Sequence, residues 1–141
     1  MKAAVCRNYN SPLTIESVSL DDPLENEIEV TLKASAICHS DISSMDGIWY
    51  DSLPAIYGHE ASGYITKIGA KVNNLKLGDK VLVTLIRSCN LCSSCISLDP
   101  TSCNFKWDDE YTPLSNKLGE KFVRGIKVGA FAEKVVVQES Q

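Results

Sequence analysis

The sequence predicts a mostly β domain, and two observations support this fold class. Residues 27–37 alternate polar and apolar side chains almost without fault, which is the period of a strand with one buried face. Several other short runs are rich in Val, Ile, Leu or Thr and are bounded by Gly, Asn, Asp or Pro. Short strands at this spacing are typical of a barrel or a sandwich.

The remaining strands are expected where these runs occur. They lie at residues 13–20, 63–68, 80–86 and 130–137, after a first strand that ends near Cys6. The pairs Asn73-Asn74 and Gly78-Asp79 supply turn residues between two of them, because Asn and Gly tolerate positive φ and Asp can bond its own backbone.

A short helix and a long loop complete the expected organisation. The helix covers residues 39–47, with Ser40 or His39 as N-cap, Asp41 in the first turn and Gly47 at the end. Residues 104–128 carry charges of both signs and no sustained period, so they are interpreted as a long surface loop.

Length and charge limit the functions that the chain can have. Its 141 residues fit one domain but are few for an enzyme that must also hold a large cofactor. The net charge of −4 and the scattered Lys and Arg argue against nucleic-acid binding. No apolar stretch approaches the roughly 20 residues that span a bilayer, and the one after Met1 is too short for a signal peptide. We therefore expect a cytoplasmic protein without a nucleic-acid or membrane partner.

Four of the six cysteines form a metal-ligand pattern. Cys89, Cys92, Cys95 and Cys103 have the spacing Cys-x2-Cys-x2-Cys-x7-Cys. Short gaps of this kind let four thiolates reach tetrahedral positions about 2.3 Å from one zinc ion. Because four sulfurs leave no coordination position for water or substrate, this zinc is expected to be structural. The segment of about residues 86–106 that carries these cysteines is called the four-cysteine lobe below.

Two other interpretations of the four-cysteine lobe stay open on sequence grounds. A pair of disulfides would suit an oxidising compartment better than the cytosol. An iron–sulfur cluster of the bacterial ferredoxin type would close with a three-residue gap and a proline after its last cysteine, whereas here the gap is seven residues and Asn104 follows. Zinc is the better prediction.

A second group of candidate ligands lies outside the lobe. Cys38 ends the best predicted strand and begins the predicted helix, where backbone N–H groups favour a thiolate. His59 could supply a second ligand, and Glu60 either a third ligand or an outer partner. The competing interpretation is that Cys38 is a buried small residue and His59 an ordinary core or surface group.

Several motifs in order resemble the zinc-containing alcohol dehydrogenases of the medium-chain dehydrogenase/reductase superfamily. Residues 58–63 (Gly-His-Glu-Ala-Ser-Gly) resemble the family signature, and residues 38–41 (Cys-His-Ser-Asp) resemble its first catalytic-zinc segment. The four-cysteine lobe resembles its structural-zinc lobe, and residues 78–81 and 129–133 resemble two further recurring stretches. The resemblance implies a GroES-like, partly open β-barrel with short helices and a loop held by zinc.

The resemblance also implies a role for each site residue. Cys38 and His59 would bind the catalytic zinc, Asp41 would hold His59 by a hydrogen bond, and Glu60 would lie against the metal. Ser40 matches the hydroxyl that takes the substrate proton, and it can be a helix N-cap as well. His39 matches a position that meets the cofactor pyrophosphate or helps the proton leave.

By this resemblance the full-length protein would oxidise an alcohol to an aldehyde or ketone by hydride transfer to NAD or NADP, and it could form a homo-oligomer. Two departures from the family pattern are visible. The outer proton-relay histidine is replaced by Ser43, and the third zinc-binding cysteine is missing, because no cysteine follows Cys103. No Gly-x-Gly-x-x-Gly follows any strand, so residues 1–141 are expected to be an incomplete GroES-like catalytic domain without its Rossmann domain.

The competing function is a non-catalytic zinc-binding module that has the same fold without the chemistry. It would have no need of Cys38, His59, Glu60, Asp41 and Ser40 together. Other conspicuous residues are expected to be structural. Cys6 is interpreted as a packing residue, Trp49 and Tyr50 as buried or edge aromatics that could otherwise line a substrate cleft, and Trp107 as part of the surface loop.

Overall fold

The structure is a computed structural model that describes residues 1–49 and 52–141. Its strands, in chain order, are β1 (Lys2–Val5), β2 (Thr14–Ser17), β3 (Ser19–Leu20), β4 (Glu27–Ser35), β5 (Ala55–Ile56), β6 (Ala61–Ile68), β7 (Lys80–Val83), β8 (Leu114–Ser115), β9 (Val123–Arg124) and β10 (Lys134–Gln138). Its helical segments are α1 (His39–Met45), α2 (Ser93–Ile96), and the 3-10 turns η1 (Pro100–Ser102) and η2 (Gly125–Lys127).

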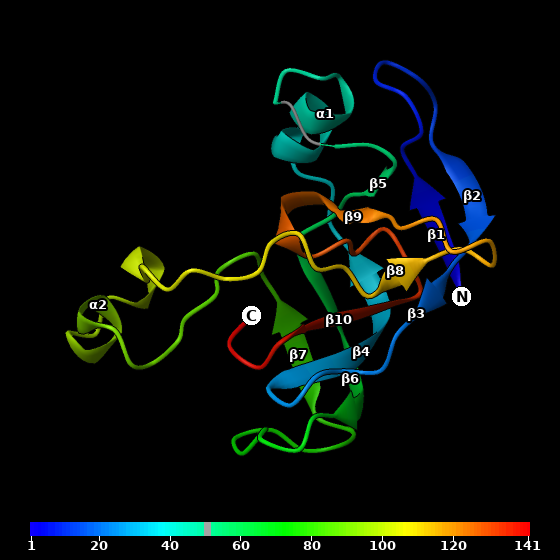
Figure 1. Cartoon of the computed structure of the whole chain (residues 1–141). Helices are drawn as coiled ribbons and strands as arrows, with labels where there is room; N and C mark the ends of the chain where they lie inside the picture. The colour runs from blue at the N-terminus through cyan, green and yellow to red at the C-terminus, as the bar shows by residue number, and fades with distance from the viewer. Residues whose placement is uncertain (50–51) are drawn as a thin grey trace.

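The described strands form four sheets (Figure 1). The largest is antiparallel, with the order β10-β4-β6-β7, and β1-β2, β3-β8 and β5-β9 are two-stranded. β5 and β9 run parallel, whereas the other pairs are antiparallel. Helix α1 and β5 lie at one end of the domain, and the connection between β6 and β7 lies at the other. The mostly β fold class is confirmed. The described strands form separate sheets and do not close into one continuous barrel.

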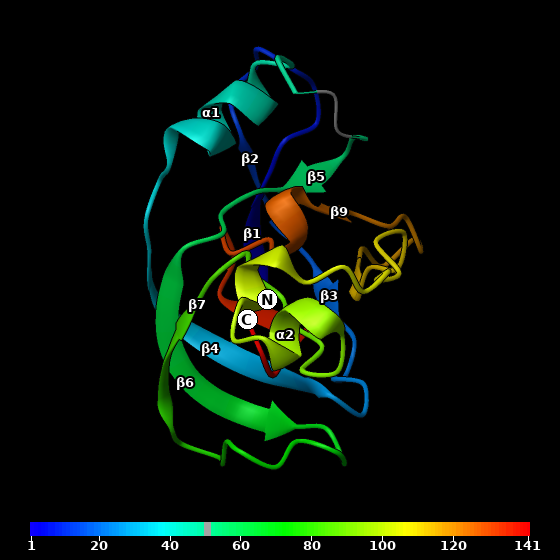
Figure 2. The ribbon, with the colours of Figure 1, turned by 90° about the vertical axis from the view of Figure 1, so that its left-hand side faces the viewer.

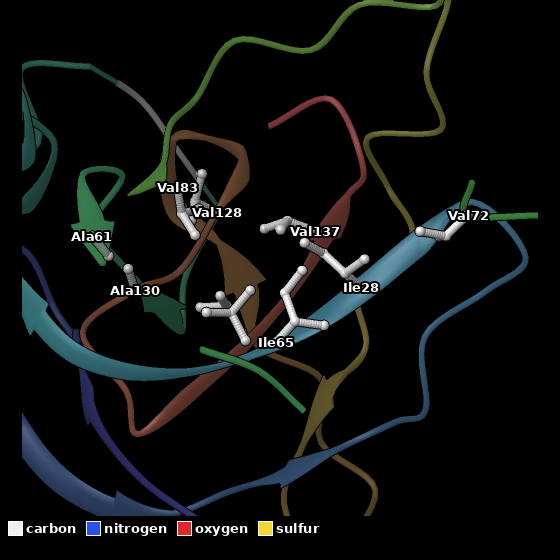
Figure 3. Packing of buried hydrophobic residues seen from close by; sticks show 10 residues of the cluster. Ile28, Ala61, Ile65, Val72, Val83, Val128, Ala130 and Val137 are labelled. Atoms are coloured by element: carbon white, nitrogen blue, oxygen red, sulfur yellow. The ribbon is translucent and has the colours of Figure 1, made fainter. Parts of the chain in front are cut away.

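The main core lies against the four-stranded sheet. Its ten buried members are Ile28, Val30, Ala61, Ile65, Val72, Val83, Val128, Ala130, Val135 and Val137. Figure 3 shows Ile28, Ile65 and Val137, from β4, β6 and β10, gathered on the same side of the sheet. Burying a Val or Ile side chain contributes about 1.5–3 kcal/mol, so this cluster is a main source of the domain's stability.

The strand predicted at residues 27–37 is present as β4, but the expectation of a single buried face is wrong for its first half. Glu27 and Glu29 are as buried as Ile28 and Val30. Glu27 accepts hydrogen bonds from the Gln138 side chain at 3.0 Å and from the backbone N–H of Leu24 at 3.0 Å. The polar face is therefore covered by neighbours that supply donors, which alternation alone does not reveal.

The other predicted strands are found with altered bounds. The run at 13–20 divides into β2 and β3, and the run at 63–68 is part of β6, which begins two residues earlier, at Ala61. The run at 80–86 ends as a strand at Val83, where the chain leaves the sheet toward the four-cysteine lobe. The run at 130–137 becomes β10 only at Lys134, because residues 129–131 bond to the segment before His59 instead.

The predicted helix is confirmed as α1, but neither Ser40 nor His39 is its N-cap. Cys38 occupies that position, and its backbone N–H donates to the carboxylate of Asp41, the third residue of the helix. This bond satisfies a donor at the strand-to-helix turn. In the described residues, no helix is long and apolar enough to cross a bilayer.

The interpretation of residues 104–128 as a surface loop is wrong for their second half. They contain β8, β9 and η2, and Leu114, Phe122 and Val128 are almost completely buried. The two strands are only two residues long and pair with β3 and β5, which lie far away in the sequence. Elements this short leave no periodic pattern in the sequence.

The buried carboxylate of Glu29 is held by cations from the neighbouring strands. Lys134 Nζ donates to it at 2.9 Å and Thr66 Oγ1 at 2.7 Å, while Lys67 Nζ lies 3.5 Å away. Burial acts to raise the pKa of Glu29, but the hydrogen bonds from Lys134 and Thr66 outweigh it, so the pKa is lowered. A carboxyl group whose pKa falls on folding stabilises the fold above its unfolded pKa, and this contribution is lost as the pH falls.

We expect Lys134→Met to lower the free energy of unfolding by roughly 1–3 kcal/mol at pH 7, because it removes a charged donor from a buried carboxylate. The difference from the parent should shrink at acidic pH, where the carboxyl group is protonated. Urea unfolding at several pH values measures both effects. Lys71→Met is the matched control: its pair with Glu25 is exposed, and its loss should change stability by less than about 1 kcal/mol. Equal losses of stability in the two variants would contradict the assignment of Lys134 as a stabilising donor to the buried carboxylate of Glu29.

Candidate metal centres

The sulfurs of Cys89, Cys92, Cys95 and Cys103 converge in the four-cysteine lobe. Cys92 caps α2, Cys95 lies within it, and Cys103 follows η1. All four ligand atoms lie within 4.8 Å of one another. The pairs Cys89–Cys95 and Cys92–Cys103 are each 4.0 Å apart, close to the about 3.8 Å expected for two thiolates 2.3 Å from one zinc. A disulfide requires sulfurs about 2.05 Å apart, so the thiols are free.

The lobe cannot be held together by its own apolar packing. Residues 88–104 include no buried side chain, and Leu91, Ile96 and Leu98 are exposed by 81%, 70% and 90%. Figure 1 shows α2 standing off the body of the domain, and Figure 2 shows it in front of the sheets when viewed from that side. Because small units without a core need a metal or disulfides, the lobe depends on what its cysteines bind.

Backbone groups of the lobe favour the thiolate at Cys92 and Cys103, whereas burial and the neighbouring Cys92 thiol raise the pKa of Cys95 to about 11. The N–H of Cys92 donates to Cys89 Sγ at 3.3 Å, and the N–H of Cys89 points at Cys103 Sγ at 3.4 Å. Backbone hydrogen bonds from Cys95 and Asn104 lower the pKa of the Cys92 thiol to about 6. The thiolate is the form that binds metal, so this part of the lobe is prepared for a cation.

Sequence reasoning missed the anchor of the lobe, which is Arg87. Its buried guanidinium pairs with the carboxylate of Asp109 and lies 5.1 Å from the ring centroid of Trp107. Trp107 is therefore a packing partner of Arg87, and its ring also meets Phe105 edge to face at 4.8 Å. The sequence signal that could have revealed this ion pair is an arginine shortly before Cys89 and the acidic run of residues 108–110 after Cys103.

The second cluster contains Cys38, His59 and Glu60. Their ligand atoms also lie within 4.8 Å of one another. They meet because β4 and β6 pair with Ser35 opposite Ala61, and the N–H of Ala36 donates to the carbonyl of Glu60 at 2.8 Å. Sheet register thus places the residues that follow β4 beside those that precede β6.

Asp41 connects the two halves of this cluster. Its side chain is completely buried. Oδ2 accepts from the N–H of Cys38 at 3.0 Å, whereas Oδ1 accepts from the N–H of Gly58 at 3.0 Å and lies 3.1 Å from Nδ1 of His59. An ionised carboxylate only accepts hydrogen bonds, so this network assigns the proton to Nδ1 and leaves the Nε2 lone pair free for a metal.

The other predicted site residues surround Nε2 of His59. Ser40 Oγ lies 3.4 Å from it and Oε1 of the exposed Glu60 lies 3.9 Å from it. His39 is exposed on α1 next to Ser40, whereas Ser43, at the expected outer relay position, is buried.

Of the two aromatic residues after α1 that are conspicuous in the sequence, the structure describes Trp49. Its side chain is 52% exposed, which excludes a buried position and leaves an edge position, and Tyr50 lies outside the described residues. Cys6, by contrast, is buried against Ala55 and Tyr57, which confirms it as a packing residue.

The structure is a mostly β domain with two clusters of side chains that could hold a metal ion, one made of four sulfurs and the other of unlike donors. The model of the alcohol dehydrogenase GroES-like domain matches residues 24–141. The chain belongs to this family, which confirms the resemblance found in the sequence and the GroES-like fold.

Individual relatives agree with this assignment. Alcohol dehydrogenase-like 2 of Arabidopsis thaliana is 32% identical over 148 residues, covering 96% of this chain and 38% of the relative. An alcohol dehydrogenase of Moraxella sp. (strain TAE123) is 37% identical over 115 residues, covering 79% of this chain and 34% of the relative. The chain therefore spans between a third and two fifths of the length of these relatives.

Solved structures show the same fold. An alcohol dehydrogenase zinc-binding domain protein from Burkholderia ambifaria matches with a TM-score of 0.89 at 28% identity, covering 98% of this chain and 40% of that one. The benzyl alcohol dehydrogenase of Acinetobacter calcoaceticus matches with a TM-score of 0.80 at 27% identity, covering 98% and 39%. The four-cysteine cluster of this chain has the donor set of a closed, structural zinc site.

We expect Cys103→Ser to remove tightly bound zinc from the four-cysteine lobe and to leave binding at Cys38 and His59 unchanged, because the two ligand sets share no residue. Metal analysis after dialysis, with increasing chelator, measures both populations. Cys6→Ala is the control, since it also removes one thiol but lies in neither cluster. Simultaneous loss of both metals from Cys103→Ser would show that the two sites are coupled.

Proposed function

We propose that the chain is the catalytic part of a zinc-dependent alcohol dehydrogenase, which in the full-length protein oxidises an alcohol to an aldehyde or ketone with NAD or NADP as hydride acceptor. The observation that supports this most strongly is the convergence of Cys38, His59 and Glu60 beside Ser40. The family and the alcohol dehydrogenases among its relatives support it as well.

The donor set of the second cluster suits a catalytic zinc. A thiolate, an imidazole and a carboxylate are all zinc ligands, and three protein donors leave a fourth position open. The imidazole is already oriented, because the carboxylate of Asp41 accepts from its Nδ1. When bound, zinc supplies a Lewis acid that lowers the pKa of an alcohol in the open position.

The chain's own residues offer a route for the alcohol proton. Ser40 Oγ, 3.4 Å from Nε2 of His59, is placed to accept that proton beside the metal position. The buried hydroxyl of Ser43 is a poor exit to solvent, whereas the neighbouring imidazole of His39 is exposed. We assign the outer end of the relay to His39, which is also the residue proposed to meet the cofactor.

The cofactor requires a further domain in this proposal. Hydride transfer needs the nicotinamide C4 within about 3–3.5 Å of the carbon that is oxidised. The sequence contains no Gly-x-Gly-x-x-Gly to hold a dinucleotide phosphate. Residues 1–141 would then be an incomplete catalytic domain with its structural-zinc lobe at about 86–106, completed by a Rossmann domain. A cytoplasmic location and a homo-oligomeric full-length protein belong to the same proposal.

An open coordination position at the second cluster is directly testable. After the four-cysteine lobe is filled with zinc, we expect cobalt(II) to enter the Cys38–His59 site and imidazole to change its visible spectrum, because only three protein donors occupy the metal. His59→Asn is the control, in which the second cobalt should bind weakly or not at all. A cobalt spectrum that imidazole leaves unchanged would mean a closed site, and would favour the non-catalytic zinc module.

We expect the 141-residue chain to bind zinc but not NAD or NADH, and to oxidise no alcohol, because it has no dinucleotide cradle. Calorimetric titration of the zinc-loaded chain measures binding. In the protein expressed from its full reading frame we expect alcohol-dependent NAD(P)H formation, with a kcat that Ser40→Ala lowers by about a hundredfold or more. Binding to the short chain tighter than about millimolar, or an inactive full-length protein, would contradict the proposal.

A further inference from the structure

The ring of Phe131 packs against the backbone of Gly58, the residue immediately before His59. The φ of Gly58 is +91°, in the left-handed region, and the residue is buried. A Cβ added to it would lie 2.6 Å from Cδ1, 2.8 Å from the backbone N and 2.9 Å from Cε1 of Phe131. The ring and the backbone of Phe131 therefore occupy the space in which any other residue would carry its side chain. Glycine permits this approach, and glycine is also the residue with the most backbone freedom to lose.

Backbone hydrogen bonds hold both sides of Gly58. Its carbonyl accepts from the N–H of Gly129 at 3.1 Å and of Ala130 at 2.8 Å, and the N–H of Phe131 donates to the carbonyl of Tyr57 at 2.8 Å. On the opposite side, its own N–H donates to Oδ1 of Asp41, the oxygen that also faces His59. The conformation of Gly58 thus determines whether the carboxylate of Asp41 can hydrogen-bond to the N–H of Gly58 and to the imidazole of His59 at the same time.

Phe131 is itself firmly placed. Its carbonyl accepts from the N–H of Ala4 in β1 at 2.7 Å. Its side chain packs against both smaller core clusters, those of Val5 and Phe122 and of Cys6 and Tyr57. Phe131 also lines an apolar hollow of about 440 Å³. Strand β1 and these clusters hold Phe131 in place, so its ring packs against Gly58 in a fixed position.

We propose that Phe131 is a positioning residue of the Cys38–His59 site: its ring confines Gly58 to the left-handed conformation and so keeps His59 directed toward Cys38. The inference rests on the metal site of the proposed function, and it adds a residue that touches neither metal nor substrate. Loss of a group that orients a metal ligand typically costs 10–100-fold in metal affinity.

Phe131→Leu tests this in the whole chain, with the four-cysteine lobe filled by zinc and cobalt(II) titrated into the second site. We expect cobalt affinity to fall about tenfold or more. In the metal-free protein, the Gly58 amide should exchange its hydrogen faster, because its bond to Asp41 opens more often. Phe131→Tyr keeps the two ring carbons that contact Gly58, and should preserve both results.

Val137→Ala is the matched control. Val137 is completely buried in the main core, against which Phe131 does not pack, so this change should lower the free energy of unfolding without altering the cobalt affinity or Gly58 exchange. If Phe131→Leu does not fold, Phe131→Met replaces it, because the unbranched Met side chain adapts to an irregular gap.

The outcomes separate the two proposals. Unchanged cobalt affinity and slow Gly58 exchange in Phe131→Leu would overturn the role of Phe131 and leave the site standing. Equal effects in Val137→Ala would overturn it too, because the loss would then follow general stability. A parent chain that takes up no second cobalt would overturn the proposed site, and the inference with it.

Discussion

The candidate site depends on one buried carboxylate. Asp41 accepts hydrogen bonds from the backbone of Cys38 and of Gly58 and faces Nδ1 of His59, so it joins the end of β4 to the segment before β6. A carboxylate taken out of water is costly unless donors surround it, and here three donors do. The same bonds begin α1, set the tautomer of the imidazole and bring the candidate metal ligands Cys38 and His59 together.

The two clusters of candidate metal ligands are held in place in different ways. The Cys38–His59 cluster is built on the main sheet, where strand register, Asp41 and the contact of Phe131 with Gly58 orient the ligands before any metal arrives. Residues 88–104 of the four-cysteine lobe include no buried side chain, and the buried Arg87 joins the start of the lobe to Asp109, beyond its end. A preorganised site suits chemistry, and a site that needs its metal in order to fold suits a structural role.

Elements with a strong local pattern could be predicted from the sequence, whereas those formed by distant partners could not. Alternation predicted β4, and short-range spacing predicted the four-cysteine cluster, because both depend on neighbouring residues. The two-residue strands β8 and β9 could not be found, since each is defined by a partner many residues away. For the same reason the burial of Glu29 by Lys134 was not visible in the alternating run.

The sequence by itself determined the mostly β class, the four thiolates and the family to which the chain belongs, because each resides in a local motif. Only the tertiary structure decided that Cys38 rather than Ser40 caps α1 and that Ser43 is buried while His39 is exposed. It also decided that Phe131 stands against Gly58, 73 residues earlier in the chain. These features arise from sheet register and packing between distant segments, which a linear pattern does not encode.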